Sequence, residues 1–111
     1  MALSCIYRLK KKKEVEMALK SGRRRGGIAF RLFFYPNREA RARYAFVISK
    51  KNLKKSVDRN RLRRLVTGWI QKNPKLLTPS FDIVCIFTPH AGQLTRKELY
   101  ADFEKNFAFL S

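Results

Sequence analysis

The sequence contains few of the residues that form metal sites, acid–base pairs or disulfide frameworks. Its 111 residues include two cysteines, one histidine and eight acidic residues. Cys5 and Cys85 lie far apart and form neither a CxxC pair nor a Cys/His cluster, which argues against zinc ligation. Two isolated cysteines fit a reducing compartment, and a disulfide between them stays an open alternative at this point. His90 falls in a predicted loop without an acidic neighbour, so we expect a surface side chain there.

Long apolar runs and cofactor motifs are also missing. No apolar run approaches the roughly 18 residues of a membrane-spanning helix. The N-terminal lysine run follows a short apolar stretch instead of preceding it, which is the reverse of a secretory signal. The acidic residues form no paired constellation for two metal ions, and there is no P-loop or dinucleotide fingerprint. The sequence therefore predicts a cytoplasmic chain with no catalytic residues of its own.

Positive charge is what the sequence has in excess. Lys and Arg number 26 against 8 Asp and Glu, giving a net charge of +18, while 45% of the residues are hydrophobic. This composition predicts one folded domain over residues 1–111, with residues 1–8 as a flexible arm. Solubility needs far less charge, so the excess predicts a polyanionic partner. Nucleic acid fits best, because a membrane-surface helix would need apolar stripes that a core already requires.

The hydrophobic periodicity predicts an α+β sandwich, with one sheet packed against helices. The expected helices cover residues 9–21, 56–72 and a segment that begins at Thr95. The expected strands cover residues 28–35, 43–49 and 81–87, with a possible short strand near 23–27. The second helix has the clearest core stripe, which consists of Leu62, Leu65, Val66, Trp69 and Ile70.

Three local signals predict where the helices begin and end. Gly22 is expected as the residue just past the first helix, and Ser56 as the N-cap of the second. Thr95 and Glu98 have the spacing of a capping box at the start of the last helix.

Segment 59–64, Arg-Asn-Arg-Leu-Arg-Arg, is the strongest candidate for a binding site. Residues four apart on a helix are neighbours, so one polar face collects four of its side chains and one arginine lies to the side. The polar face consists of Arg59, Asn60, Arg63 and Arg64, and the arginine to the side is Arg61. Guanidinium groups match phosphate oxygens in pairs, and an asparagine between them can bind a sugar hydroxyl or a base edge. A solvated helix face normally mixes charge signs, and this one has only Asp58 nearby.

A second candidate is the strand over residues 28–35. Alternation places Arg31, Phe33 and Tyr35 on one face, which suits a platform for unstacked bases. The same rings could equally be core beneath a helix. The lysine run 10–13 likewise fits either a solvated face or phosphate binding.

Three segments resemble the bacterial ribonuclease P protein subunit. The most specific runs from Ser49-Lys50-Lys51 through a short linker to Val57-Asp58-Arg59-Asn60-Arg61-Leu62-Arg63-Arg64-Leu65. The segment from Arg8-Leu9 to Lys20-Ser21-Gly22 resembles the family's first helix, and Gln93-Leu94-Thr95 with Glu98 resembles the start of its last helix. The resemblance covers about residues 8–108.

The resemblance implies a function in a ribonucleoprotein endoribonuclease. That enzyme removes the 5′ leader from precursor tRNA, and its RNA subunit does the chemistry with Mg²⁺. The protein would bind this ribonuclease P RNA in a 1:1 complex, would also contact precursor tRNA, and would hold no tightly bound cofactor itself. A generic structural RNA binder, such as a ribosomal protein, fits the charge and size equally well, but the Lys-Lys to Arg-Asn-Arg spacing favours ribonuclease P.

The resemblance also assigns residues by position. Contacts to the RNA subunit are expected from Lys50, Lys51, Lys54, Lys55, Arg59, Asn60, Arg61, Arg63 and Arg64. A cleft for the leader is expected from Lys12, Val15, Leu19, Arg31 and Phe33. No metal ligand is assigned. Many family members carry phenylalanine where this chain has Val15 and Leu19, which reduces the stacking available in the cleft.

The family's fold is the remaining expectation. It is a mixed four-stranded sheet with three helices, similar to domain 2 of ribosomal protein S5, and it contains a left-handed βαβ crossover. The general rule for parallel strands would predict a right-handed connection.

Overall fold

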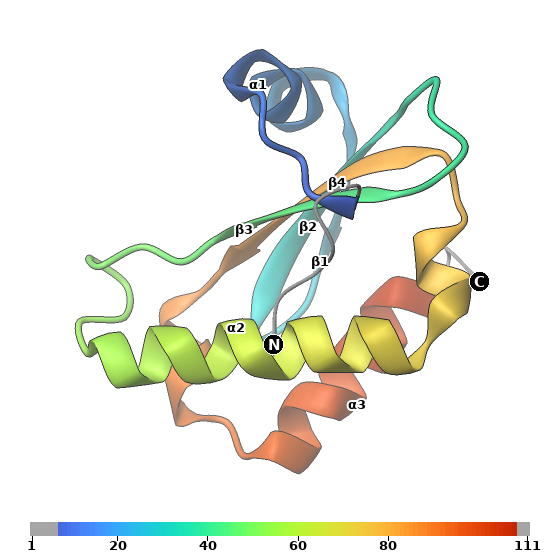
Figure 1. Cartoon of the computed structure of the whole chain (residues 1–111). Coiled ribbons are helices and arrows are strands. Elements are labelled where there is room, and N and C mark those ends of the chain that lie inside the picture. The colour runs from blue at the N-terminus through green and yellow to red at the C-terminus, as the bar shows by residue number, and fades with distance from the viewer. Residues whose placement is uncertain (1–6, 109–111) are drawn as a thin grey trace.

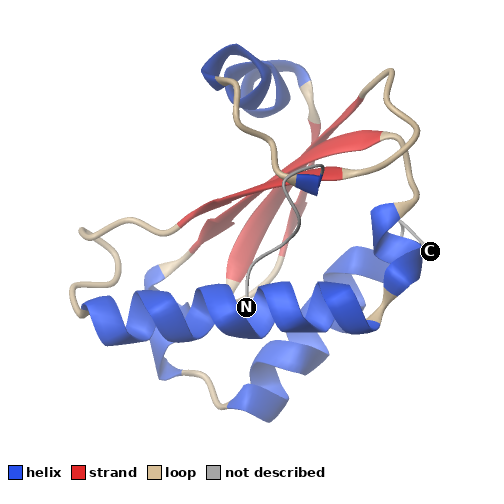
Figure 2. Ribbon diagram, in the orientation of Figure 1, coloured by secondary structure: helices blue, strands red, loops and turns tan. Residues whose placement is uncertain are grey.

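The computed structural model describes residues 7–108, and a mixed four-stranded sheet lies at its centre (Figures 1 and 2). The strands are β1 (Arg23–Gly26), β2 (Phe30–Pro36), β3 (Arg43–Val47) and β4 (Phe81–Phe87). The helices are α1 (Lys12–Ser21), α2 (Ser56–Lys72) and α3 (Arg96–Phe107), with the 3₁₀ turns η2 (Pro74–Leu77) and η3 (Pro89–Gln93). The expected α+β class with three helices and four strands is therefore confirmed.

The strand order is β1-β2-β4-β3, with β3 parallel to β4 and the other pairs antiparallel. Helix α2 connects the two parallel strands and crosses one face of the sheet (Figure 1). The path from β3 through α2 to β4 is left-handed, as the family resemblance implied and contrary to the general preference.

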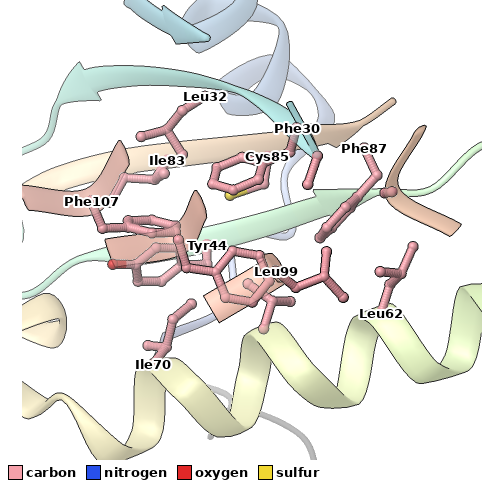
Figure 3. Packing of buried hydrophobic residues seen from close by; sticks show 14 of the residues in the cluster. Phe30, Leu32, Tyr44, Leu62, Ile70, Ile83, Cys85, Phe87, Leu99 and Phe107 are labelled. Atoms are coloured by element: carbon pink, nitrogen blue, oxygen red, sulfur yellow. The ribbon is translucent and has the colours of Figure 1, made fainter. Parts of the chain in front are cut away.

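The two faces of the sheet are covered unequally. Helices α2 and α3 lie together on one face, and α1 lies over part of the other (Figure 1). The main core fills the space between the sheet and helices α2 and α3 (Figure 3). It includes Phe30, Leu32, Tyr44, Ile83 and Phe87 from the strands, and Leu62, Ile70, Leu99 and Phe107 from the helices. Each such side chain stabilises the fold by about 1.5–3 kcal/mol on burial.

Cys85 is a free thiol at the centre of this core and is fully buried. Burial raises the pKa of this thiol, so it stays protonated at neutral pH. Its role is therefore packing. Cys5 lies outside the described residues.

Helix α1 begins at Lys12, three residues later than the pattern predicted. The preceding residues are extended along β3 instead, because Arg8 bridges Tyr44 in parallel and the Leu9 amide donates to the Tyr44 carbonyl at 2.8 Å. Of the flexible arm expected over residues 1–8, residues 1–6 lie outside the described part, and Tyr7 packs against the main core.

Of the two other expected caps, Gly22 is confirmed as the residue just past α1, and Ser56 is wrong. The Gly22 backbone is extended, with φ −76° and ψ 164°. A side chain there would collide with the carbonyls of Ala18 and Phe34, so glycine permits a close approach instead of a left-handed turn. Ser56 is the first residue of α2, and the N-cap position belongs to Lys55, which forms no side-chain cap.

The capping box before α3 is confirmed. The Glu98 amide donates to Thr95 Oγ1 at 3.2 Å, and the Thr95 amide donates to Glu98 Oε1 at 2.9 Å. Hydrogen bonds from the Thr95 backbone and side chain lower the pKa of Glu98.

Asp102 fixes α3 to the start of β2, a contact that sequence reasoning missed. Its carboxylate accepts hydrogen bonds from the backbone amides of Ile28 at 3.1 Å and Ala29 at 3.0 Å. Gly27 lies so close that a Cβ there would be 2.7 Å from this carboxylate. Asp102 is thus structural. Within residues 7–108, no helix has the length and apolarity needed to cross a membrane.

Candidate nucleic-acid interface

The outer face of α2 carries most of the predicted binding residues. Leu62, Val66 and Ile70 are buried against the sheet, which turns the opposite side of the helix to solvent. Of the predicted residues, Asn60, Arg63 and Arg64 are exposed on α2, and Lys54 and Lys55 are exposed directly before it. The structure therefore brings this part of the predicted set together on one surface without an apolar cover.

Arg59 is partly buried and has a structural task. Its Nη1 donates to the carbonyl oxygens of Leu53 at 2.7 Å and Lys54 at 3.0 Å. These bonds fold the linker back onto the first turn of α2. Arg59 thus positions Lys54 and Lys55 beside the helix, in addition to its predicted contact with RNA.

Arg61 leaves the common face, as its helical position predicted. Its Nη2 lies 3.4 Å from the Leu94 carbonyl oxygen, just before α3. Its guanidinium therefore projects toward the boundary between α2 and α3.

Lys50 and Lys51 are exposed in the turn that follows β3. The Lys51 amide donates to Ser49 Oγ at 3.0 Å, and the Leu53 amide donates to the Ser49 carbonyl at 2.9 Å. Leu53 is buried in the main core, which anchors the turn. A short, fixed turn thus extends the basic surface of α2 toward the end of β3.

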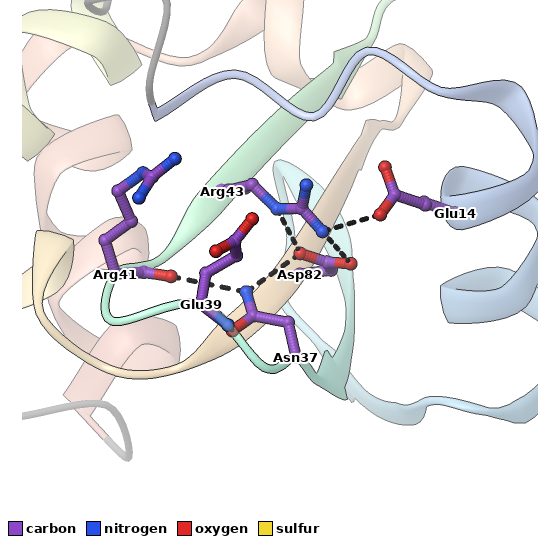
Figure 4. Close-up of polar contacts among 6 residues, drawn as sticks. All are labelled: Glu14, Asn37, Glu39, Arg41, Arg43 and Asp82. Atoms are coloured by element: carbon purple, nitrogen blue, oxygen red, sulfur yellow. Dashed lines mark hydrogen bonds and ion pairs between the residues drawn. The ribbon is translucent and has the colours of Figure 1, made fainter.

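On the other face of the sheet, an ion-pair network fastens α1 (Figure 4). Arg43 on β3 donates to Asp82 on β4, from Nε to Oδ1 at 2.9 Å and from Nη2 to Oδ2 at 3.0 Å. The same Nη2 donates to Glu14 of α1 at 2.7 Å, and Asn37 Nδ2 donates to Asp82 Oδ1 at 2.9 Å. Arg43 and Asp82 are partners in the strand register, which sequence spacing alone does not reveal.

The predicted leader residues divide into a covered and an exposed group. Val15 and Leu19 are half-buried and pack, together with fully buried Ala18, against Phe33 and Val84. Phe33 is only 9% exposed, so its ring is mainly core beneath α1. This sheet face was expected to be either a platform for unstacked bases or core beneath a helix, and at Phe33 it is core. Lys12 is exposed in the first turn of α1.

Arg31 lies two residues before Phe33 on β2, on the same sheet face, and is exposed. Its partner across β4 is Ile86, whose partner on β3 is Val47. Ile86 is partly buried and Val47 is 37% exposed. The row Arg31–Ile86–Val47, which we call the open row, is therefore an accessible part of this face that α1 does not cover.

Among the described residues, no group of three or more His, Cys, Asp and Glu side chains is placed to hold a metal ion. Four carboxylates already have structural partners. They are Glu14 and Asp82 with Arg43, Asp102 with backbone amides, and Glu98 in the capping box.

Comparison with known proteins gives consistent matches. Residues 3–110 match the family model described as Ribonuclease P. The ribonuclease P protein component of Coxiella burnetii is 36% identical over 76% of this chain and 69% of that protein. That of Fusobacterium nucleatum is 30% identical over 88% of this chain and 87% of that protein. A solved structure of the Staphylococcus aureus RNase P protein superposes with a TM-score of 0.83 at 23% identity, covering 93% of this chain and 94% of that one.

Proposed function

We propose, because this chain belongs to the ribonuclease P protein family, that it is the RNA-binding subunit of a ribonuclease P ribonucleoprotein. In this proposal the RNA subunit cleaves precursor tRNA with Mg²⁺ that the RNA itself holds. The protein binds one RNA subunit, contacts the 5′ leader and promotes its removal, in the cytoplasm.

The exposed basic face of α2 is the observation that carries the proposal. Asn60, Arg63 and Arg64 lie together on it, and the lysines of the 50–55 turn continue it. A run of guanidinium and ammonium groups along a rigid helix suits the phosphates of a folded RNA, which positions the RNA without reading its sequence. Arg59 keeps the adjoining linker in place, so much of this surface is preformed.

The open row supports a second contact, to the single-stranded leader. Arg31 supplies a cation for a phosphate, and Ile86 with Val47 supplies an apolar surface against which bases can lie. Because Phe33 is covered by α1, we expect bases to contact alkyl groups more than rings. Stacking contributes about 1–3 kcal/mol per base where it occurs, so this contact is the weaker of the two.

The structural use of the carboxylates argues for catalysis by the RNA. Glu14 and Asp82 are paired with Arg43, and Asp102 is bonded to backbone amides. Metal-assisted phosphodiester cleavage needs carboxylates grouped around Mg²⁺ or an RNA that binds the ion itself. An RNA that binds the ion itself fits this chain, which would contribute positive charge and hold the RNA in position.

The test is precursor-tRNA cleavage at low Mg²⁺ by a bacterial ribonuclease P RNA, with the protein, without it, and with the protein alone. Polylysine at equal positive charge serves as the control for unspecific neutralisation. We expect cleavage at the mature 5′ end only when RNA and protein are combined. Unchanged activity on adding the protein would favour a generic RNA binder, and cleavage by the protein alone would show that a catalytic site had been missed.

A further inference from the structure

A basic groove lies between α2 and α3, beside the surface described above. It has a volume of about 360 Å³. Its lining includes Arg61, Arg64, Gly68 and Lys72 from α2, and Arg96 and Tyr100 from α3. We propose that this groove, the α2–α3 groove, receives one unstacked nucleotide of the RNA subunit. The inference rests on the proposed function and adds a binding site to it.

Charge is the first observation. Four of the lining side chains are cationic, and none of the described residues that line the groove is acidic. Arg64, Gly68 and Lys72 lie four residues apart along α2, so two cations flank an open position on one stripe of the helix. Arg61 reaches the same space from beside Leu94. This arrangement suits the phosphate of a nucleotide.

A preformed stacking surface is the second observation. The Arg96 guanidinium carbon lies 5.4 Å from the centre of the Tyr100 ring, and Arg96 Nε donates to Tyr100 Oη at 3.2 Å. The Tyr100 ring is itself supported by Phe103, whose ring centre is 6.1 Å away and which is fully buried. Aromatic rings and guanidinium planes are the two surfaces on which proteins stack unpaired bases of RNA. The Arg96–Tyr100 pair provides both.

Gly68 is the third observation. Glycine weakens a helix interior, and close packing does not require it here, because a Cβ at this position would meet nothing within 4 Å. Gly68 therefore lowers the stability of α2, and packing within the protein does not explain why glycine stands there. The missing side chain leaves the floor of the groove open, and a ligand in the groove would account for it.

Together these observations favour a nucleotide. A row of cations alone would suit any polyanion, but cations around a stacking pair and an open floor match phosphate and base in one site. The RNA subunit is the expected source, because Arg64 belongs to both the groove and the exposed basic surface of α2, and Arg61 is also among the residues expected to contact that RNA. Helix α1 lies on the other side of the sheet (Figure 1), where Ile86 of the open row packs against the same cluster as Ala18 of α1.

Filling the groove is the sharpest test. We would measure binding of Gly68→Met and Gly68→Ala proteins to the ribonuclease P RNA, together with their melting temperatures. Both changes should raise the melting temperature, because both residues favour helix. Gly68→Met should weaken binding roughly 5- to 150-fold, the range for losing one stacked base, whereas Gly68→Ala should change it little. Equal binding by the two variants would overturn the inference.

A charge-matched pair gives an independent test if filling the groove disturbs the fold. Arg96→Ala removes a groove residue, and Lys97→Ala removes the same charge from an exposed neighbour on α3. Arg96→Ala should weaken RNA binding at least about fivefold more than Lys97→Ala, because it removes a stacking surface as well as a charge. Equal effects would mean that Arg96 acts on RNA only through its charge, and they would contradict a nucleotide site in the α2–α3 groove.

The outcomes separate the two proposals. If the unmodified protein fails to bind the RNA subunit, the proposed function fails. If it binds and all four variants bind equally well, only the groove inference fails. If the variants bind the RNA subunit normally but lose affinity for precursor tRNA in the assembled enzyme, the nucleotide comes from the substrate, and the RNA subunit is excluded as its source.

Discussion

The two faces of the sheet both carry arginine, but they use it differently. On the α1 face, Arg43 is fixed by two carboxylates, with its side chain 15% exposed. On the α2 face, Arg63 and Arg64 are exposed on a helix whose other side is core. The first arrangement joins a helix to two strands, and the second leaves positive charge available to a ligand. Residue type alone therefore does not identify a binding surface in a protein of such high charge.

The largest expected effect concerns the fixed arginine. Arg43→Met leaves Glu14 and Asp82 facing each other without a cation, and Asp82 is 5% exposed. We expect the free energy of unfolding to fall by about 3 kcal/mol, measured by urea denaturation. Arg38→Met, an exposed neighbour in the loop after β2, is the control and should change stability little. Equal stability of the two variants would mean that Arg43 does not hold α1 in place.

The next effect concerns the exposed arginines of α2. Arg63→Ala combined with Arg64→Ala should weaken binding to the ribonuclease P RNA by about 2 kcal/mol, roughly 30-fold, with stability unchanged. The slope of log K against log salt should become shallower by about 1.5, because two phosphate contacts are lost. Lys97→Ala with Lys105→Ala removes the same charge from exposed positions on α3 and should have a much smaller effect. A large loss of stability in the arginine variant would show that these side chains are structural.

A smaller effect is expected at the open row. Arg31→Ala should weaken binding of precursor tRNA to the assembled enzyme about tenfold, by removing one contact to a charged group. The effect should disappear with a substrate that lacks the leader, and binding of the RNA subunit should stay unchanged. An equal loss with both substrates would place Arg31 outside the leader contact.

The smallest effect separates stability from binding. Thr95→Ala removes the N-cap of α3 and should cost about 1 kcal/mol of stability without changing RNA binding. The pKa of Glu98 is lowered in the folded state, so its contribution is present above the unfolded pKa and is lost as the pH falls through the folded pKa. Thermal melts between pH 7 and roughly pH 3 should therefore show a weaker acid dependence in Glu98→Gln, which has no carboxylate to protonate. An unchanged acid dependence would remove Glu98 from the cap.

Sequence patterns predicted the central elements well. The bounds of α2 and β4 agree with the predicted ranges 56–72 and 81–87. In α2 the core stripe is regular and Asn73-Pro74 stops the helix, so local information suffices. The start of α1 was missed because Leu9 pairs with distant Tyr44, a contact that overrides helix periodicity.

The candidate site was predictable to the extent that it lies on one helix. The exposed positions of Asn60, Arg63 and Arg64 follow from helix geometry and the core stripe opposite. The Arg43–Asp82 pair joins residues 39 positions apart, so it required the strand register. The α2–α3 groove was also missed, because Gly68 and Tyr100 come together only when two helices pack on the same sheet.

The most direct measurement asks which RNA lies at which face. Hydroxyl-radical probes would be attached at Lys54→Cys, beside α2, or at Val47→Cys, in the open row, in a Cys5→Ser background where Cys85 is buried. In the assembled enzyme with precursor tRNA, we expect the first probe to cleave the RNA subunit and the second to cleave the 5′ leader. Cleavage of the same RNA by both probes, or the reversed pattern, would contradict the assignment of one face to each RNA.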